Sequence, residues 1–405
     1  MVGARQMSSG VVPGSRRALL PTFYGQVGNR CYIATATGDN LQYQFESQHD
    51  VWITNAGSNI IYTAETNSVC GGGAGFADSG TGGALTASMG VEYPVGSGNW
   101  VRSTWAGATS ASIASNTFAW SQTALTLPAG KSRIKMVRRL KNANVLALTR
   151  QANGARRNLA FGDAAQQSLV DRTMTGGVVD DGGDYMCWPA AIVAQTNYVS
   201  VGGIGDSITA GEGDSAASGG HQGILFHALG DLYPYINQGV AGQGYVTSAN
   251  SSLRRALLAY CTTIVSANGI NARVSSAATM YAASLAQGSD MSPREYWQAT
   301  LLPKSDSNAT PPAGWTDPTG ADQTVDGFNS NRAGFNDLLR AGLRCLENAD
   351  QYEITRNGGK WKGNTPHWTD DGTHPNSTGY GVAVYSSFAP TSAGLIAFMP
   401  SSAPV

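Results

Sequence analysis

Charged side chains are scarce in this chain of 405 residues. Asp, Glu, Lys and Arg make up 13% of it, about half of their usual share in soluble domains. The 26 basic and 27 acidic residues nearly cancel, to a net charge of −1. No overall charge is therefore present to attract nucleic acid or an anionic membrane surface. Glycine (51 residues) and small polar residues take the place of charge, which is typical of β-rich proteins and favours an extracellular location.

Long apolar segments are absent as well. No run of 18 or more apolar residues occurs in the sequence, so no membrane span is expected. Residues 1–21 contain three arginines but lack the continuous apolar core of a secretory signal, and we interpret them as an N-terminal tail. Export by another route is compatible with this pattern, so the compartment stays open.

Cysteine is sparse, and none of the five cysteines stands in a C-x-x-C pair. This spacing argues against a zinc ribbon or a thioredoxin-type site, and no other ligand cluster indicates a metal or an organic cofactor. Cys261 and Cys345 fall in apolar segments and are expected to be buried free thiols. Cys31 and Cys70 can form a disulfide, while the odd count leaves at least one thiol unpaired in a monomer.

The first half of the chain, residues 22–190, has the pattern of an all-β domain. Short runs rich in Val, Ile, Thr, Tyr and Trp alternate with turns of Gly, Asn and Ser. Several short strands at this spacing predict an antiparallel β-sandwich, jelly-roll-like in kind. The basic cluster Arg133–Lys141 alternates charge with apolar residues and is interpreted as a half-solvated strand. Tryptophans of this half, if exposed, can stack on sugar rings and make it a carbohydrate-binding domain; the candidates are Trp52, Trp100, Trp105 and Trp120.

The second half, residues 191–405, alternates strand and helix patterns. This alternation predicts a parallel sheet covered by helices on both faces. The expected strands are Tyr198–Ile204, Tyr233–Ile236, Thr262–Ala267, Gln298–Leu302 and Tyr352–Thr355. The expected helices are Gly220–Leu232, Ser252–Tyr260, Ser275–Ala286, Arg332–Leu346 and Gly379–Phe388. In such sheets, ligands bind at the carboxyl ends of the strands.

Four short segments follow strands of this half in the order that a hydrolytic site needs. Gly205-Asp206-Ser207-Ile208-Thr209 places a serine directly after the first strand, where Asp206 or Ser207 can alternatively cap the next helix. It is not a G-x-S-x-G elbow. Asn237-Gln238-Gly239-Val240-Ala241-Gly242 and Gly269-Ile270-Asn271 follow the next two strands. Asp371-Gly372-Thr373-His374 pairs a carboxylate with an imidazole three residues later, as orientation of a histidine base requires.

In this order the segments resemble the blocks of the SGNH or GDSL hydrolase superfamily, over residues 198 to about 390. The resemblance implies a flavodoxin-like α/β/α sandwich with a five-stranded parallel sheet. It also implies that Ser207 is the nucleophile, His374 its base and Asp371 the residue that orients His374. The oxyanion hole would be formed by the Ser207 and Gly242 N–H groups and the Asn271 side chain.

Some residues depart from the family pattern or compete with it. Ala272 stands where the family has Asp, which puts the bracing of that loop in doubt. Gly334-Phe335-Asn336-Asp337 matches the third block by letters, but it lies inside a helix pattern. Asp370 competes with Asp371 at a less suitable spacing. The histidines His49, His221, His227 and His367 sit in no comparable motif, although His367 and Trp368 can border the site.

The predicted function is that of a serine esterase acting through an acyl-enzyme, most simply by deacetylating a carbohydrate. A lipase or thioesterase of the same superfamily is the first alternative. The second is a non-enzymatic glycan-binding or virion-associated protein with a vestigial hydrolase fold. The expected partner is a small ester or an acylated carbohydrate, and the oligomeric state is open. Residues 305–327, rich in Pro, Asp, Thr and Gly, are either a lid beside the site or a surface excursion.

Overall fold

A computed structural model describes most of the chain between residues 24 and 382. The described residues are 24–26, 28–29, 33–37, 41–70, 78–80, 82–142, 145–150, 170–177, 185–186, 189–196, 198–214, 223–230, 233–245, 252–292, 294–306, 312–342, 345–362 and 367–382. The expected tail at 1–21 and the residues Cys31 and Cys187 lie outside this set, and so does the possible Cys31–Cys70 disulfide.

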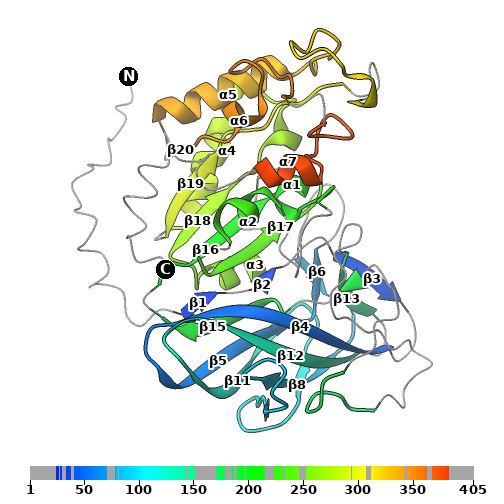
Figure 1. The fold of residues 1–405 in the computed structure, drawn as a ribbon, viewed down its shortest axis with the longest axis vertical. Coiled ribbons are helices and arrows are strands. Elements are labelled where there is room, and N and C mark those ends of the chain that lie inside the picture. Colours follow the sequence, from blue (N-terminus) through cyan, green and yellow to red (C-terminus); the bar gives the residue numbers. More distant parts are fainter. Residues whose placement is uncertain are drawn as a thin grey trace.

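Two antiparallel sheets form the N-terminal part, shown at the bottom of Figure 1. The first contains, in spatial order, β1 (Tyr24–Gln26), β15 (Ala191–Gln195), β5 (Gly57–Thr66) and β11 (Phe118–Leu127). The second contains β10 (Ala111–Ile113), β8 (Leu85–Glu92), β12 (Gly130–Asn142) and β4 (Leu41–Ile53), with β9 (Trp100–Arg102) paired to β8. Smaller sheets join β14 (Tyr185–Met186), β13 (Val145–Arg150) and β3 (Ile33–Thr37), and β6 (Ser68–Cys70) with β7 (Asp78–Gly80).

The two larger sheets share one apolar core. Phe45 and Met136 of the second sheet and Ile61 and Leu125 of the first belong to the same buried cluster. Alternate residues of β11 are buried from Ser121 onward, as expected of strands with one face on a core. The predicted pair of packed sheets is therefore present, whereas a jelly-roll order of connections stays a prediction.

The basic cluster is a strand, as predicted, but it is not simply half-solvated. Arg138 of β12 is completely buried, and its Nη1 lies 3.0 Å from Oε2 of Glu65 on β5. This ion pair joins the two sheets of the sandwich. Arg133 donates two hydrogen bonds, of 2.8 and 3.1 Å, to Asp50 of the neighbouring strand. Acidic residues on other strands thus pair with both of these cations.

A separate, fully parallel sheet forms the C-terminal part (Figure 1). Its spatial order is β2 (Gly28–Asn29), β17 (Tyr235–Gly239), β16 (Val201–Gly205), β18 (Thr263–Ser266), β19 (Glu295–Ala299) and β20 (Cys345–Leu346). Without β2, the five strands follow the order 2-1-3-4-5 of a flavodoxin-like sheet. The five-stranded parallel sheet is thus confirmed, and a short strand from the N-terminal half extends its edge.

The last strand of this sheet was predicted at the wrong place. The segment expected to be a strand, Tyr352–Thr355, instead begins with the last residue of the short helix α6 (Ala349–Tyr352). The strand is β20, whose residues Cys345 and Leu346 were expected to end the helix that actually spans Asn329–Gly342 (α5). Leu346 continues the helical spacing of apolar residues by coincidence, while burial in the sheet determines its actual conformation.

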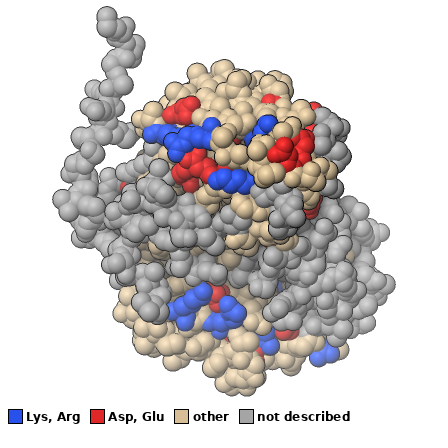
Figure 2. All heavy atoms as spheres, turned by 45° about the horizontal axis from the view of Figure 1, so that its top comes forward, with Lys and Arg blue, Asp and Glu red and all other residues tan. Residues whose placement is uncertain are grey.

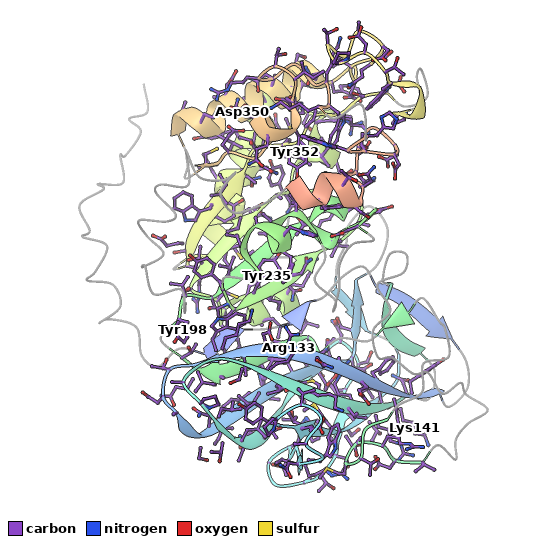
Figure 3. The ribbon with its side chains drawn as sticks, viewed as in Figure 1. Arg133, Lys141, Tyr198, Tyr235, Asp350 and Tyr352 are labelled. Atoms are coloured by element: carbon purple, nitrogen blue, oxygen red, sulfur yellow. The ribbon has the colours of Figure 1, made fainter. Side chains whose placement is uncertain are left out.

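Helices and loops cover both faces of the parallel sheet. Val201, Tyr235 and Val265 point to one face and form a cluster with α2 (Ile224–Leu229), α6 and Tyr380 of α7 (Ser377–Val382). Figure 3 labels Tyr235 and Tyr352 in this layer. The alternate residues, among them Ile204, Ile236 and Ile264, point to the other face and pack on α3 (Ser252–Leu258). The helix α4 (Ala277–Asp290) packs with α5.

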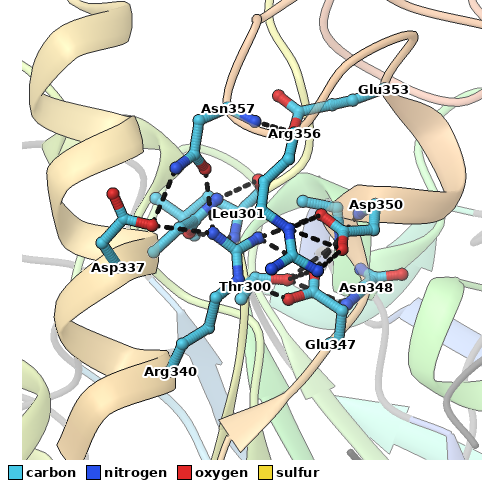
Figure 4. A network of polar contacts seen from close by, with 12 residues as sticks. Thr300, Leu301, Asp337, Arg340, Glu347, Asn348, Asp350, Glu353, Arg356 and Asn357 are labelled. Atoms are coloured by element: carbon cyan, nitrogen blue, oxygen red, sulfur yellow. Dashed lines mark hydrogen bonds and ion pairs between the residues drawn. The ribbon is translucent and has the colours of Figure 1, made fainter. Parts of the chain in front are cut away.

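Polar contacts fix the edge of the sheet at β20 (Figure 4). Arg340 of α5 contacts Glu347 at 2.6 Å, Asp350 at 3.2 Å and Asp337 at 3.1 Å. Thr300, which follows β19, accepts hydrogen bonds from the backbone N–H groups that open α6. These contacts hold α5, β20 and α6 together. The face drawn in Figure 2 shows Lys and Arg close to Asp and Glu, with no large area of one sign among the described residues.

Candidate active site

The turn after β16 presents Ser207 at the carboxyl end of the sheet. Asp206 caps the short helix α1 (Ser207–Ala210) by accepting a 3.0 Å hydrogen bond from the Ile208 N–H. Asn237 donates a 2.7 Å hydrogen bond to the Thr209 carbonyl and so ties the second motif to this turn. Gly239 is required here, because a Cβ at this position would lie 2.5 Å from the Ala210 nitrogen. The two interpretations of the first motif are compatible. Asp206 caps the helix, and the Ser207 hydroxyl remains available for a catalytic role.

Three side chains predicted to act together form one hydrogen-bonded row. Ser207 Oγ lies 2.7 Å from His374 Nε2, and His374 Nδ1 lies 2.5 Å from Asp371 Oδ2. The other Asp371 oxygen accepts 2.8 Å hydrogen bonds from the backbone N–H groups of Thr373 and His374. These bonds fold the segment back on itself, so the carboxylate reaches the imidazole of its own loop. The structure therefore brings Ser207, His374 and Asp371 together although 167 residues separate the first two in sequence.

The protonation states of Asp371 and His374 suit a base at His374 Nε2. Burial opposes ionisation of Asp371, but the hydrogen bonds from the His374 ring and backbone outweigh it and hold the pKa of Asp371 far below its usual value. Burial also disfavours the His374 cation, yet the Asp371 hydrogen bond and the charges of Asp371 and Glu212 raise the pKa of His374. An ionised Asp371 can only accept, so the proton of neutral His374 sits on Nδ1, and Nε2 is free to accept from Ser207.

Asp206 is a second carboxyl group close to this row. It is fully buried, and its Oδ2 has no hydrogen-bond partner among the described residues. Burial raises the pKa of Asp206 to about 7, against the hydrogen bond from Ile208 and the charge of His374. Asp206 is therefore protonated much more readily than Asp371, whose pKa is shifted in the opposite direction.

The residues predicted for the oxyanion hole lie on neighbouring strand ends. Gly242 follows β17 by three residues with a φ of +78°, and Asn271 lies in the turn after β18. Asn271 Nδ2 donates a 3.1 Å hydrogen bond to the Gln243 carbonyl, which places its side chain beside the Gly242 turn. Within the described parts of the chain, the N–H groups of Ser207 and Gly242 donate to no acceptor. Their roles toward an oxyanion stay a prediction.

The Asn271 turn has a brace that the sequence did not reveal. Arg273 donates a 3.0 Å hydrogen bond to the Ile270 carbonyl and pairs with Asp326 through contacts of 3.0 and 3.2 Å. Ala272 stands where the SGNH or GDSL pattern has an Asp. The Arg273–Asp326 pair holds the turn in place of that Asp. Asp326 belongs to the segment 305–327, and Ser305 N donates a 2.9 Å hydrogen bond to the Gly372 carbonyl. This segment therefore contacts both the Asn271 turn and the His374 loop.

The turn that carries Ser207 and the His374 loop are also joined through Tyr380 of α7. The Tyr380 hydroxyl lies 3.2 Å from the Ile208 carbonyl and 3.0 Å from the Glu212 carbonyl. Its ring stacks on His227 with centroids 5.9 Å apart, and His227 Nε2 lies 2.8 Å from the buried Asp214. His227 was predicted to be a structural or surface residue, and its contacts are those of a structural residue behind the turn that carries Ser207.

Glu212 was missed altogether. Its carboxylate is half exposed, and Oε2 lies 3.7 Å from His374 Nε2. The sequence gives no signal for this contact, because Glu212 is an isolated surface residue five positions after Ser207.

The competing residues occupy other places. Asp370 accepts a 2.8 Å hydrogen bond from Asn376 rather than from His374. Asn336 lies in α5. Its side chain accepts a 2.8 Å hydrogen bond from the Leu301 N–H and donates a 3.0 Å hydrogen bond to the Leu301 carbonyl. His49 contacts Ser47 inside the sandwich at 2.8 Å, and Trp368 packs edge-on against Tyr352. His221 lies outside the described residues.

The four tryptophans considered for sugar binding are not exposed. Trp52 and Trp105 are buried in the sandwich core. Trp100 is half-buried under Lys135, whose Nζ lies 5.1 Å from the centre of the ring. Trp120 packs edge-on against Tyr260 near α3, with ring centroids 5.1 Å apart. Trp52 and Trp105 are therefore unavailable to a sugar, and Trp100 and Trp120 are partly covered by their neighbours; a carbohydrate-binding role of this half stays a prediction.

Cys261 and Cys345 are buried free thiols, as predicted. Burial raises the pKa of Cys345 to about 12 and that of Cys261 still further, so neither thiol is a nucleophile at neutral pH. In the part of the chain that the structure describes, no three His, Cys, Asp or Glu residues are arranged to hold a metal ion. No described helix combines the length and apolar character needed to cross a bilayer.

Solved structures similar to this chain are GDSL-like lipases and acylhydrolases. A GDSL-like lipase from Bacteroides thetaiotaomicron is 17% identical, with 45% of this chain and 82% of that chain covered and a TM-score of 0.30. A member of the lipolytic protein G-D-S-L family from Veillonella parvula is 14% identical, with 48% and 97% covered and a TM-score of 0.33. The lipase/acylhydrolase from Enterococcus faecalis is 17% identical, with 44% and 89% covered and a TM-score of 0.30. No family model matches the chain, and no curated protein matches it.

Proposed function

We propose that the protein is a serine hydrolase of carboxylic esters that works through an acyl-enzyme. The observation that carries this proposal is the row Ser207–His374–Asp371, with contacts of 2.7 and 2.5 Å at the carboxyl edge of a parallel sheet. A serine needs a base within hydrogen-bond reach and a third group that orients the base. All three are in place in this row.

The reaction would proceed in two halves. Ser207 Oγ attacks the ester carbonyl carbon while its proton passes to His374 Nε2. Collapse of the tetrahedral intermediate breaks the bond to the alcohol oxygen, which takes the proton from Nε2 and leaves as the alcohol. Water then attacks the acyl-enzyme, gives a proton to Nε2, and releases the acid as Ser207 recovers that proton. Asp371 stabilises the imidazolium in both halves.

The negative charge that develops on the carbonyl oxygen is stabilised by hydrogen-bond donors whose positions are fixed before the reaction. The Ser207 and Gly242 N–H groups and the Asn271 amide are the proposed donors. Their support is indirect: the three follow adjacent strands β16, β17 and β18, and the Asn271 amide is anchored one residue beyond Gly242.

The finer proposal is that the substrate is an acylated carbohydrate, from which the protein removes acetyl or similar groups. The tryptophans of the sandwich give this substrate proposal no support, so the proposal depends on the groups around His374. A lipase or thioesterase preferring long acyl chains is the alternative of the same class. A non-enzymatic protein with a vestigial hydrolase fold is the alternative of another class, and the Ser207–His374 contact argues against it.

Covalent labelling tests the nucleophile. A fluorophosphonate should label the wild-type protein once and should not label Ser207→Ala, whereas Ser112→Ala, an exposed serine of the sandwich, should label normally. Hydrolysis of p-nitrophenyl esters from acetate to octanoate then separates the substrate classes. A maximum at acetate supports deacetylation, and a maximum at octanoate supports a lipase. Equal labelling of wild type and Ser207→Ala refutes the assignment of the nucleophile.

A further inference from the structure

Glu212 combines a fixed backbone with a free side chain beside the candidate active site. Its N–H donates a 2.9 Å hydrogen bond to the Ser207 carbonyl, and its carbonyl accepts from Tyr380 at 3.0 Å. The side chain is 54% exposed. The backbone contacts therefore determine where the carboxylate stands, while the carboxylate itself supports no packing.

Among the described residues, the one ion pair of Glu212 is its contact with His374. Within the described part of the chain, His374 is the only basic side chain within 4.0 Å of it, at 3.7 Å from Nε2. Two other described cations near the site have carboxylate or hydroxyl neighbours of their own: Arg273 pairs with Asp326, and Lys304 hydrogen-bonds Thr373 and lies in the field of Asp306, Asp326 and Asp371. A substrate thus meets a net negative charge on the Glu212 side of Nε2.

The position of Glu212 identifies the part of the substrate that it faces. His374 Nε2 gives its proton to the oxygen of the departing alcohol, so that oxygen must come within hydrogen-bond distance of Nε2. A carboxylate 3.7 Å from the same nitrogen lies beside the alcohol part of the ester. Two of the proposed oxyanion donors, Gly242 and Asn271, follow the strands β17 and β18 and would face the carbonyl oxygen.

We propose that Glu212 is a specificity-determining residue that selects the alcohol part of the ester. It favours alcohols that carry a positive charge or a hydroxyl donor next to the ester oxygen, and it disfavours alcohols with a negative charge there. An ionised carboxylate can only accept hydrogen bonds, which suits the neighbouring hydroxyls of a polyol. This inference rests on the proposed esterase function and narrows its substrate to neutral polyols or cationic alcohols.

Three acetate esters of similar size test the charge rule. Acetylcholine carries a cationic alcohol, 3,3-dimethylbutyl acetate is its neutral isostere, and 2-sulfoethyl acetate carries an anionic alcohol. In the wild type, kcat/KM should fall in that order, with about a tenfold gap between the charged esters at low salt. Glu212→Gln should bring the charged esters close together, and Glu212→Lys should reverse their order. Asp337→Asn, which removes an exposed charge from α5, should leave the wild-type order unchanged.

A hydroxyl series tests the second half of the proposal. Glycerol monoacetate should be hydrolysed better than propyl acetate by the wild type, and this preference should shrink at least severalfold in Glu212→Gln. The pH profile supplies an independent readout, because the Glu212 charge contributes to the raised pKa of His374. In Glu212→Gln the acid limb of kcat/KM should therefore move to lower pH.

The outcomes separate this inference from the proposed function. If 3,3-dimethylbutyl acetate is hydrolysed by the wild type but the charge order is the same in Glu212→Gln, the selection by Glu212 is refuted and the esterase stands. If neither the wild type nor any Glu212 variant hydrolyses the neutral ester, the esterase proposal itself fails. A reversed order in Glu212→Lys, with the neutral ester unaffected, supports both.

Discussion

The buried Asp206 should make the protein less stable as the pH rises. Its pKa is about 7 in the folded protein and 3.8 in an unfolded chain. A carboxyl with a raised pKa adds stability at low pH, and this contribution is lost as the pH rises through the folded value. From these two values, Asp206 should lower the free energy of unfolding by about 3 kcal/mol between pH 5 and pH 9.

Asp206→Asn isolates this effect. Asn caps helices as well as Asp does, so the bond to the Ile208 N–H can be kept while the titration is removed. Urea unfolding at pH 5 and pH 9 should show the variant gaining about 3 kcal/mol over the wild type between the two pH values. Asp337→Asn, at an exposed site, serves as the charge-matched control. Equal pH dependence of Asp206→Asn and the wild type would mean that Asp206 is ionised at little cost, and the burial argument would be wrong.

Three further predictions concern the site and the sandwich. Asp371→Asn should lower kcat by about 10²- to 10⁴-fold and shift the acid limb of the pH–rate profile to lower pH, because His374 loses the charge that raises its pKa; an unmoved limb would exclude the pairing. Asn271→Ala should lower kcat on p-nitrophenyl acetate by about 10²- to 10³-fold with little change in KM or thermal midpoint, and a pure KM effect would contradict an oxyanion role. Arg138→Met should cost about 3 to 5 kcal/mol in urea unfolding by leaving Glu65 buried without its cation. The double variant with Glu65→Leu should recover most of that loss, and a double variant as unstable as the single one would refute the explanation.

Sequence reasoning succeeded where a local pattern determines a local structure. A short apolar strand that ends in Gly205-Asp206 leaves a capped turn with Ser207 at its start, and the spacing of Asp371 and His374 lets one loop close on itself. These features need only neighbouring residues. The parallel order of the strands then brings the separate turns to one edge of the sheet. The resemblance to the SGNH or GDSL hydrolases then assigned Ser207, His374 and Asp371 to one set, and the structure brings the three side chains together.

Sequence reasoning failed where contacts between distant segments decide the local structure. Tyr352–Thr355 has the composition of a strand, but the sheet edge is already completed by β20 and the chain turns into α6 before that point. Glu212 reaches His374 only because the turn that carries Ser207 and the His374 loop face each other. Arg138 stands among exposed basic residues in sequence, and only the opposite sheet supplies Glu65. Pairings of this kind leave no periodic signal in one sequence.

The sandwich is part of the same folded unit as the sheet that carries the site. One buried cluster contains Ala64 and Val193 of the sandwich together with Ile236 and Leu257 of the C-terminal part. The strand β2, from the N-terminal half, extends the sheet beside β17. Removing the sandwich would expose this shared apolar surface to water, at a cost proportional to its area. Binding or activity of either half is therefore best measured in the full chain, where a substitution such as Glu212→Gln changes the site without opening the interface.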